Sequence, residues 1–227
     1  MIEQRTARTL LVSAFCLLLS LPVLAQSLVP AGKQRAHRWD FAMGAVFQDS
    51  ESVSGQNGSR LDLNSTTGFT MSFDYNFNNH IAVGFGMDFL RPGYRATVNP
   101  DGQSPKTVRH TADMFNGQFR GIWNILEGPI TPFVQGSIGW THIDSNLASE
   151  PPTTGCWWDP WWGYVCANFW KTYTDTSMSY GFAGGLRWDI TNMMFVRGSY
   201  SVFRPEWDVD SGKPTFGQGR IELGWRF

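Results

Sequence analysis

The chain has 227 residues, a formal net charge of −1 and only 16% charged residues, yet it contains 11 Trp, 17 Phe and 24 Gly. This composition excludes a long disordered protein, and the charge gives no basic footprint for nucleic acid. The mean hydropathy of −0.24 is too polar for a bundle of membrane helices. These values together favour an all-β chain rich in aromatic residues.

The first 25 residues have the features of a cleaved secretory signal. Arg5 and Arg8 precede an uncharged stretch from Leu10 to Leu21, and small side chains stand before a cleavage point after Ala25. The apolar run is shorter than the roughly 20 residues that a membrane-spanning helix needs. We therefore predict export, with residues 26–227 as the mature protein.

Eight segments of the mature chain alternate between large apolar residues and small or polar ones, which is the pattern of β-strands with one apolar face. They fall at about 39–47, 68–77, 81–89, 115–125, 134–140, 178–190, 194–202 and 220–227. The apolar face of the second segment, for example, carries Phe69, Met71, Phe73, Tyr75 and Phe77. Each segment approaches the roughly 9–11 residues that a tilted strand needs to cross a bilayer.

The size of the apolar face indicates which side of each strand meets water. A soluble barrel would turn this face inward, but an eight-stranded barrel is just wide enough inside for its side chains, so that many rings would overpack it. Turning the large face toward lipid fits the volume. We therefore predict an all-β, eight-stranded antiparallel up-and-down transmembrane β-barrel, with a soluble barrel as the alternative.

The connections between the segments alternate in length. Short turns are expected near Asn78, Gly128 and Asn192, and long connections at about 49–65, 91–110, 145–172 and 204–215. Bacterial outer-membrane barrels have short periplasmic turns and longer external loops. The pattern predicts four external loops, both termini in the periplasm and aromatic residues at both membrane boundaries, among them Trp39, Tyr75, Trp123, Trp188, Phe47, Phe89 and Trp140.

The last segment, Arg220 to Phe227, alternates strictly and ends on phenylalanine. With this terminus and the eight segments, the mature chain resembles the eight-stranded outer-membrane β-barrel proteins of Gram-negative bacteria, the group that includes the opacity-type and outer-membrane-protein-A-type barrels. The resemblance implies that Trp225 and Phe227 belong to the assembly signal read by the outer-membrane insertion machinery. It also implies a surrounding of outer-membrane lipids and lipopolysaccharide.

Alternation places ten charged residues on the inward faces: Asp40, Asp74, Asp88, Arg120, Arg187, Asp189, Arg197, Arg220, Glu222 and Arg226. Five positive and five negative charges sum to zero, and charges in a narrow interior need partners or water. One interpretation is a paired polar plug, and the other is a narrow ion path gated by exchange of partners. The small lumen of eight strands favours the plug.

The third long connection contains Cys156 and Cys166, which are the two cysteines of the mature chain. An exported protein meets an oxidising compartment, so we predict a disulfide between them. The aromatic residues of this stretch form a candidate external binding platform: Trp157, Trp158, Trp161, Trp162 and Tyr164. The alternative is a cluster that packs on the barrel mouth or enters the outer leaflet. Asp159 and Pro160 predict a turn between the tryptophan pairs.

We also considered catalysis at His142, Asp144 and Ser145, near the outer end of the fifth segment. Asp144 stands where the His-x-Ser pattern of the lipid A deacylases would place serine, so a resemblance to those enzymes fails. We predict no catalytic residue, no metal and no cofactor. The expected function is a non-enzymatic structural or surface-interaction role, and the alternative is a narrow channel or lateral transporter for small or hydrophobic molecules.

Overall fold

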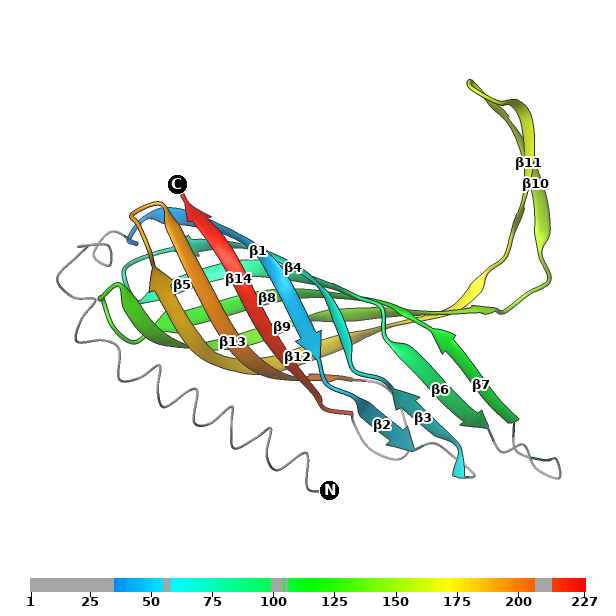
Figure 1. Cartoon of the computed structure of the whole chain (residues 1–227), viewed down its shortest axis with the longest axis horizontal. Helices are drawn as coiled ribbons and strands as arrows, with labels where there is room; N and C mark the ends of the chain where they lie inside the picture. The colour runs from blue at the N-terminus through cyan, green and yellow to red at the C-terminus, as the bar shows by residue number, and fades with distance from the viewer. Residues whose placement is uncertain (1–34, 55–57, 99–103, 105, 207–213) are drawn as a thin grey trace.

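The computed structural model describes residues 35–54, 58–98, 104, 106–206 and 214–227. Eight strands close into an antiparallel barrel (Figure 1). Around the barrel they are β1 (Arg38–Gln48), β4 (Thr66–Asn76), β5 (Ile81–Leu90), β8 (Asp113–Asn124), β9 (Ile130–Ala148), β12 (Thr172–Asp189), β13 (Met194–Pro205) and β14 (Phe216–Arg226). Each barrel strand is therefore a neighbour of the next one along the chain, which confirms the predicted up-and-down barrel.

The barrel closes where the last strand meets the first. Asp40 lies opposite Arg226 in the β1–β14 register, and Trp39 and Phe227 exchange two backbone hydrogen bonds of 2.9 Å. Closure leaves no unpaired strand edge in the wall. The predicted signal peptide, residues 1–25, lies outside the described residues. No helix in the described part of the chain is long and apolar enough to span a membrane.

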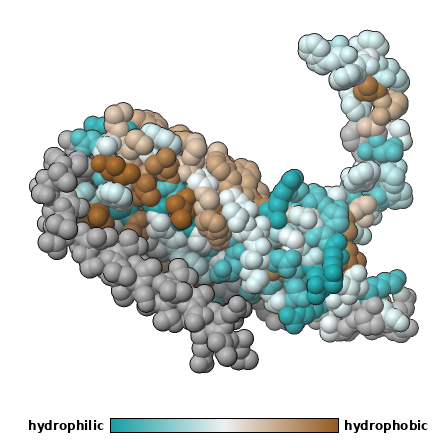
Figure 2. All heavy atoms as spheres, viewed as in Figure 1, coloured by the Kyte–Doolittle hydropathy of each residue, from teal (hydrophilic) through white to brown (hydrophobic). Residues whose placement is uncertain are grey.

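Alternation along the strands sorts the side chains into an outward and an inward set. Trp123 and Ile138 point outward and are 54% and 57% exposed, whereas Arg120 and Thr141 on the same two strands are buried. Hydrophobic residues accordingly gather over the barrel wall in Figure 2, while hydrophilic residues cover the part beyond it. An apolar outer wall over a polar interior is the arrangement that a bilayer requires.

Aromatic side chains line both ends of the apolar wall. We call the end that holds Arg38 and Phe227 the turn end and the opposite end the loop end. The ring centroids of Trp39 and Tyr75 lie 5.0 Å apart at the turn end, and those of Phe89 and Phe115 lie 5.1 Å apart toward the loop end. These contacts between neighbouring strands form the two aromatic girdles of a membrane barrel.

Short turns connect the barrel strands at the turn end. The Asn78 side chain accepts hydrogen bonds from the backbone N–H groups of His80 (2.8 Å) and Ile81 (2.7 Å). Thr191 similarly accepts a hydrogen bond from Met194 N–H at 2.9 Å. Polar side chains with local hydrogen bonds of this kind hold chain reversals, as the sequence predicts for these positions.

The loop end contains more regular structure than the sequence indicates. β9 and β12 have 19 and 18 residues and extend well beyond the alternating segments predicted at 134–140 and 178–190. Four short strands form a separate sheet in the order β2 (Glu51–Ser54), β3 (Arg60–Leu63), β6 (Gly93–Val98) and β7 (Lys106–Thr111). A hairpin of β10 (Thr153–Asp159) and β11 (Gly163–Phe169) lies within the third long connection.

Candidate functional site

Among the described residues, the ion pairs of the lumen fall into three groups, and the central group joins four charged residues. Arg120 donates two hydrogen bonds to Asp74, of 2.7 and 2.6 Å. Arg197 donates to Glu222 at 2.8 and 3.1 Å and to Asp74 at 3.2 Å. The Ser72 hydroxyl adds a hydrogen bond of 3.1 Å to Glu222. All four charged side chains are nearly inaccessible to solvent.

The second group lies toward the loop end. Arg220 donates to Asp88 at 3.2 and 2.6 Å, to the Gln218 side chain at 2.6 Å and to the Ser201 hydroxyl at 2.7 Å. A single guanidinium thus binds acceptors on β5, β13 and β14. β13 and β14 are neighbours, but β5 lies three strands away from β14 around the barrel, so the contact with Asp88 crosses the lumen.

The third group lies at the turn end and has more cations than anions. Arg187 pairs with Asp40 at 2.7 Å and with Asp189 at 3.0 Å. Arg226 pairs with the same two carboxylates at 3.1 and 2.7 Å. Arg35, which precedes β1, enters this group and contacts Asp189 at 2.7 Å.

Arg35 changes the charge balance that the sequence predicts. The ten lumen charges assigned by alternation are all buried, but the described residues hold six buried arginines against five buried acids. The expected sum of zero is therefore wrong. Arg35 is fully buried and donates to the backbone carbonyls of Leu126 (3.0 Å) and Gly128 (2.6 Å). It precedes the first alternating segment, so periodicity could not assign it to the lumen.

Four phenylalanines also point inward, which corrects the expectation that the inward face is small, polar or charged. Phe133, Phe195, Phe203 and Phe216 are each at most 2% exposed. The Arg187 guanidinium lies 3.9 Å from the centroid of the Phe195 ring. This cation–π contact fills the space over Gly224, where an added Cβ would come within 2.1 Å of the same ring.

An apolar cluster occupies the lumen at the loop end, beyond the ion pairs. Its buried members are Val46, Leu63, Leu90, Tyr94, Ala112, Met114, Phe203 and Phe216. The Tyr94 hydroxyl donates to the backbone carbonyl of Ser145 at 2.9 Å, which joins β6 to β9. Next to this cluster is a cavity of about 240 Å³, lined mainly by apolar atoms of Leu61, Leu63, Ile143 and Tyr173.

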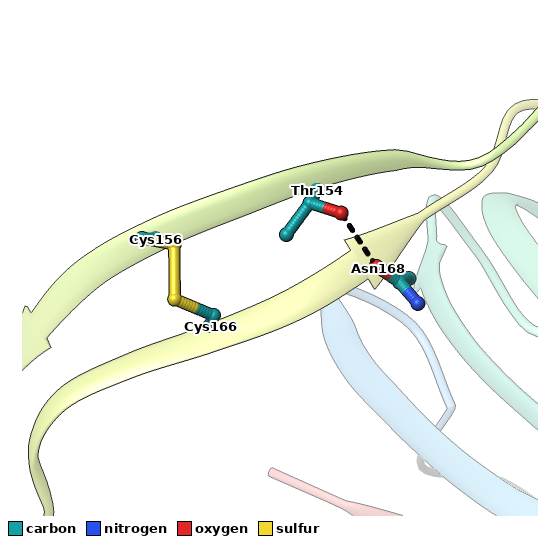
Figure 3. The surroundings of a disulfide bond; sticks show 4 residues. All are labelled: Thr154, Cys156, Cys166 and Asn168. Carbon is teal, nitrogen blue, oxygen red and sulfur yellow. Dashed lines mark hydrogen bonds between the residues drawn. A yellow bond between two sulfur atoms is a disulfide. The ribbon is translucent and has the colours of Figure 1, made fainter.

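The β10–β11 hairpin contains the predicted disulfide. Cys156 and Cys166 face one another across the two strands and are bonded, which confirms this pairing (Figure 3). Trp158 lies opposite Tyr164 two residues nearer the tip and on the same face as the disulfide. Trp157 pairs with Val165 on the other face. Alternation therefore divides the predicted aromatic platform between two faces.

The tip of the hairpin is a tight turn with its aromatic rings in solvent. Asp159 Oδ1 accepts hydrogen bonds from the backbone N–H groups of Trp161 (2.8 Å) and Trp162 (2.9 Å). Gly163 follows with φ +77°, a conformation that glycine adopts without strain. Trp161 and Trp162 are 86% and 82% exposed. The hairpin projects away from the barrel in Figure 1.

The residues considered for catalysis do not form a nucleophile–base pair. His142 Nδ1 contacts the Thr176 hydroxyl at 2.7 Å. Asp144 accepts hydrogen bonds from Asn146 N–H and the Thr172 hydroxyl, both at 2.8 Å. The Ser145 hydroxyl accepts a hydrogen bond from Leu147 N–H at 3.2 Å. In the described ranges, no group of three or more His, Cys, Asp and Glu residues could hold a metal ion.

A closed eight-stranded barrel with an apolar wall, two aromatic girdles and a charged interior is the structure of an outer-membrane β-barrel protein. The model of the outer membrane protein beta-barrel domain family matches residues 13–227, and the chain belongs to this family. The family places the protein in the outer membrane of a Gram-negative bacterium, among its lipids.

Solved structures of other outer-membrane proteins are similar to this chain. The outer membrane protein OprG from Pseudomonas aeruginosa matches with 12% identity and a TM-score of 0.55, over 88% of this chain and 99% of OprG. Ail of Yersinia pestis, in complex with the heparin analogue sucrose octasulfate, matches with 15% identity and a TM-score of 0.49, over 85% of this chain and 99% of Ail. At such low identity, the similarity to OprG shows the fold alone. No curated protein sequence matches this chain.

Proposed function

We propose that this protein is a non-enzymatic outer-membrane barrel with a closed lumen, and that it acts through the surface its loop end presents outside the cell. Both termini would then lie in the periplasm, because the long connections emerge at the end opposite to them. The observation that carries the proposal is the burial of inward side chains along the barrel, from Arg35 at the turn end to Phe203 and Phe216 at the loop end.

The ion pairs support a plug because each group connects distant strands. The Arg220–Asp88 pair crosses the barrel, and Arg197 joins β13 to both β4 and β14. During an exchange of these partners, one buried charge would be unpaired in the intermediate state, which costs several kcal/mol. A paired interior therefore opposes a stable ion path.

Single-channel recording in a planar bilayer tests the closed lumen. We expect no stable openings from the purified barrel at neutral pH. As a positive control, Arg220→Ala/Asp88→Ala removes one crossing pair without leaving an unpaired charge, and we expect it to admit brief small currents. Frequent stable openings of the unchanged protein would refute the plug.

The surface role can be tested separately with arrays of cell-surface and lipid components. We expect binding by the full protein and its loss when residues 153–169 are replaced by a short Gly-Ser turn. The replaced protein must retain the barrel, as judged by its far-ultraviolet circular dichroism. Equal binding by both forms would assign the surface role to another loop.

A second function is supported by the apolar cavity of about 240 Å³ between β3, β6, β9 and β12. Its apolar lining favours a small hydrophobic molecule bound at the loop end of the barrel. Transfer of a fluorescent apolar probe into proteoliposomes tests this alternative. If the barrel accelerates transfer and Leu61→Trp, which fills the cavity, abolishes the acceleration, the transport function is correct and the closed-plug function is incomplete.

We also propose that Trp225 and Phe227 form the assembly signal. Phe227 is 60% exposed and directly follows β14, the strand that closes against β1. Phe227→Ala should slow insertion by the purified assembly machinery but leave spontaneous folding into detergent nearly unchanged. Equal slowing of both reactions would instead indicate a purely structural role.

A further inference from the structure

The hairpin tip combines exposed aromatic rings with almost no charge. Between residues 151 and 170 the sequence has a single charged residue, Asp159. One oxygen of its carboxylate accepts the two backbone N–H groups of the turn. At the base of the hairpin, Lys171 pairs with Glu150 at 3.2 Å. A strongly charged partner, such as a sulfated glycan or a basic protein, would therefore find little complementary charge on this surface.

Four rings surround the tip and lie mostly in solvent. Trp158 and Tyr164 form a cross-strand pair and are 73% and 71% exposed, and Trp161 and Trp162 occupy the turn between their strands. Tryptophan and tyrosine have an apolar body and one polar group, and they concentrate where lipid headgroups meet hydrocarbon. The same residue types form the girdles of this barrel.

The polar groups near the rings are less suited to a neutral sugar. Recognition of hydroxyl groups requires side chains with free hydrogen-bonding capacity next to the aromatic surface. On the face that carries Trp158 and Tyr164, the Thr154 hydroxyl donates to the Asn168 side-chain oxygen at 2.8 Å (Figure 3). Because these two side chains bond to each other, they have less hydrogen-bonding capacity left for the hydroxyl groups of a sugar. This favours a lipid interface over a saccharide.

The part of β9 beyond Trp140 and the part of β12 before Met178 pair with each other, and we call them the polar ribbon. This ribbon separates the hairpin from the membrane that the barrel spans. Trp140 is the last large apolar residue on the outer face of β9, and His142 and Asp144 follow it with polar partners on β12. The eight residues that follow Trp140, up to Ala148, extend about 26 Å along the strand, or about 20 Å along the barrel axis at the usual tilt. The rings therefore start well beyond the apolar wall, as Figure 1 shows for β10 and β11.

A disulfide and two turn hydrogen bonds constrain the hairpin before it meets a partner. The Cys156–Cys166 bond fixes the two strands next to the rings, and the Asp159 hydrogen bonds hold the turn. A preorganised surface loses little conformational entropy on binding. A small set of four rings can therefore be sufficient for attachment.

We propose that the tip of the β10–β11 hairpin docks into the headgroup region of a second, apposed phospholipid bilayer. Trp158, Trp161, Trp162 and Tyr164 insert, and the polar ribbon of β9 and β12 acts as the spacer between the two membranes. This inference rests on the proposed function, since it requires the loop end to face outside the cell.

The test mixes protein in nanodiscs with separate phosphatidylcholine vesicles and measures co-flotation. We expect the unchanged protein to float with the vesicles and Trp161→Ala/Trp162→Ala to bind roughly a hundredfold more weakly, about tenfold for each buried ring. The matched control is Trp170→Ala, because Trp170 is 59% exposed but lies outside both strands of the hairpin. The control should float as the unchanged protein does.

Brominated phosphatidylcholine, which quenches tryptophan fluorescence, identifies the bilayer that the rings enter. The girdle tryptophans are quenched by the nanodisc lipids in every variant, so the signal is the difference between the unchanged protein and Trp161→Ala/Trp162→Ala. We expect this difference when the second vesicles carry the bromine. A difference only with brominated nanodisc lipids would show insertion into the protein's own membrane and would overturn the proposal.

Failure of this inference is distinguishable from failure of the proposed function. Vesicle docking that is unchanged in Trp161→Ala/Trp162→Ala would leave a surface role through other loops but refute docking by the hairpin. Binding to neutral glycans without binding to vesicles would likewise refute it. In each case the single-channel recording of the closed lumen is unaffected.

Discussion

Removing the Arg197 guanidinium should destabilise the barrel by about 3–5 kcal/mol, the usual cost of leaving a buried charge unpaired. Arg197→Met keeps much of the side-chain volume but removes the hydrogen bonds of 2.8 and 3.1 Å to Glu222. Glu222, whose side chain is 1% exposed, then keeps the hydrogen bond that the Ser72 hydroxyl donates to it. Asp74 is less affected, because it keeps both hydrogen bonds from Arg120.

A second substitution distinguishes the free energy lost with the ion pair from the cost of leaving the Glu222 carboxylate buried without its partner. Arg197→Met/Glu222→Gln removes both charges, and we expect it to recover most of the lost stability, because replacing a buried ion pair by neutral groups is often nearly neutral. The matched surface control is Arg91→Met. Arg91 pairs with Asp113 through side chains that are 77% and 40% exposed, so its loss should cost about 0–1 kcal/mol.

The measurement is reversible urea unfolding in detergent micelles, followed by tryptophan fluorescence and analysed by linear extrapolation. The unchanged protein, both single variants and the double variant are compared at one pH and one salt concentration. A cost below about 1 kcal/mol for Arg197→Met would refute the reasoning, since it would mean that water already solvates this site. A double variant as unstable as the single one would refute it as well.

Three further predictions concern other parts of the molecule. Cys156→Ser/Cys166→Ser should destabilise the hairpin by about 3 kcal/mol and speed amide exchange in β10 and β11 without affecting the barrel strands; faster exchange throughout would contradict a local role. Hydrogen bonds from Ser52 and then Arg60 hold the pKa of Asp62 below its ordinary value of 3.8. The stabilising contribution of Asp62 is therefore fully present above pH 3.8 and is lost as the pH falls through its lower folded value, so amide exchange in β2 and β3 should rise only below pH 3.8. Arg35→Ala should cost about 1–3 kcal/mol in the same urea assay and speed exchange at Gly128 and nearby turn residues, and unchanged exchange there would show that Arg35 does not hold the turns together.

Strict alternation predicted the two faces of the barrel well, because every outward position that contacts lipid requires an apolar side chain. The four inward phenylalanines obey the same alternation. Phe195 stands two residues before Arg197, and Phe133 stands two residues before Gln135, so both were on the inward face by parity alone. The expectation went wrong by assigning faces according to side-chain size. The small neighbour Gly224 is what makes room for the Phe195 ring.

Other features depend on contacts that no local pattern contains. Arg35 reaches Asp189 and the carbonyl of Gly128 because barrel closure brings distant turns together at one end. The extensions of β9 and β12 were missed for a different reason. Beyond Trp140 the outer face of β9 carries His142 and Asp144, so the pattern of an apolar outer face ends although the backbone pairing continues, for example between His142 and Thr176. Ile143, on the opposite face, packs against the apolar cluster.

The placement of charge along the molecule links the closed lumen to the exposed hairpin. The buried arginines and acids are concentrated within the barrel, where pairing across the lumen fixes the wall, whereas the hairpin has one carboxylate in a stretch of twenty residues. The hairpin pairs with itself and is joined to the barrel only through the ribbon of β9 and β12. Substitutions at Arg197 and at Trp161 therefore have no shared contact partner, and distant sites of this kind contribute additively to stability. The rigidity of the barrel and the chemistry of the tip can for this reason vary independently, which is what a membrane-anchored stalk with an aromatic tip requires.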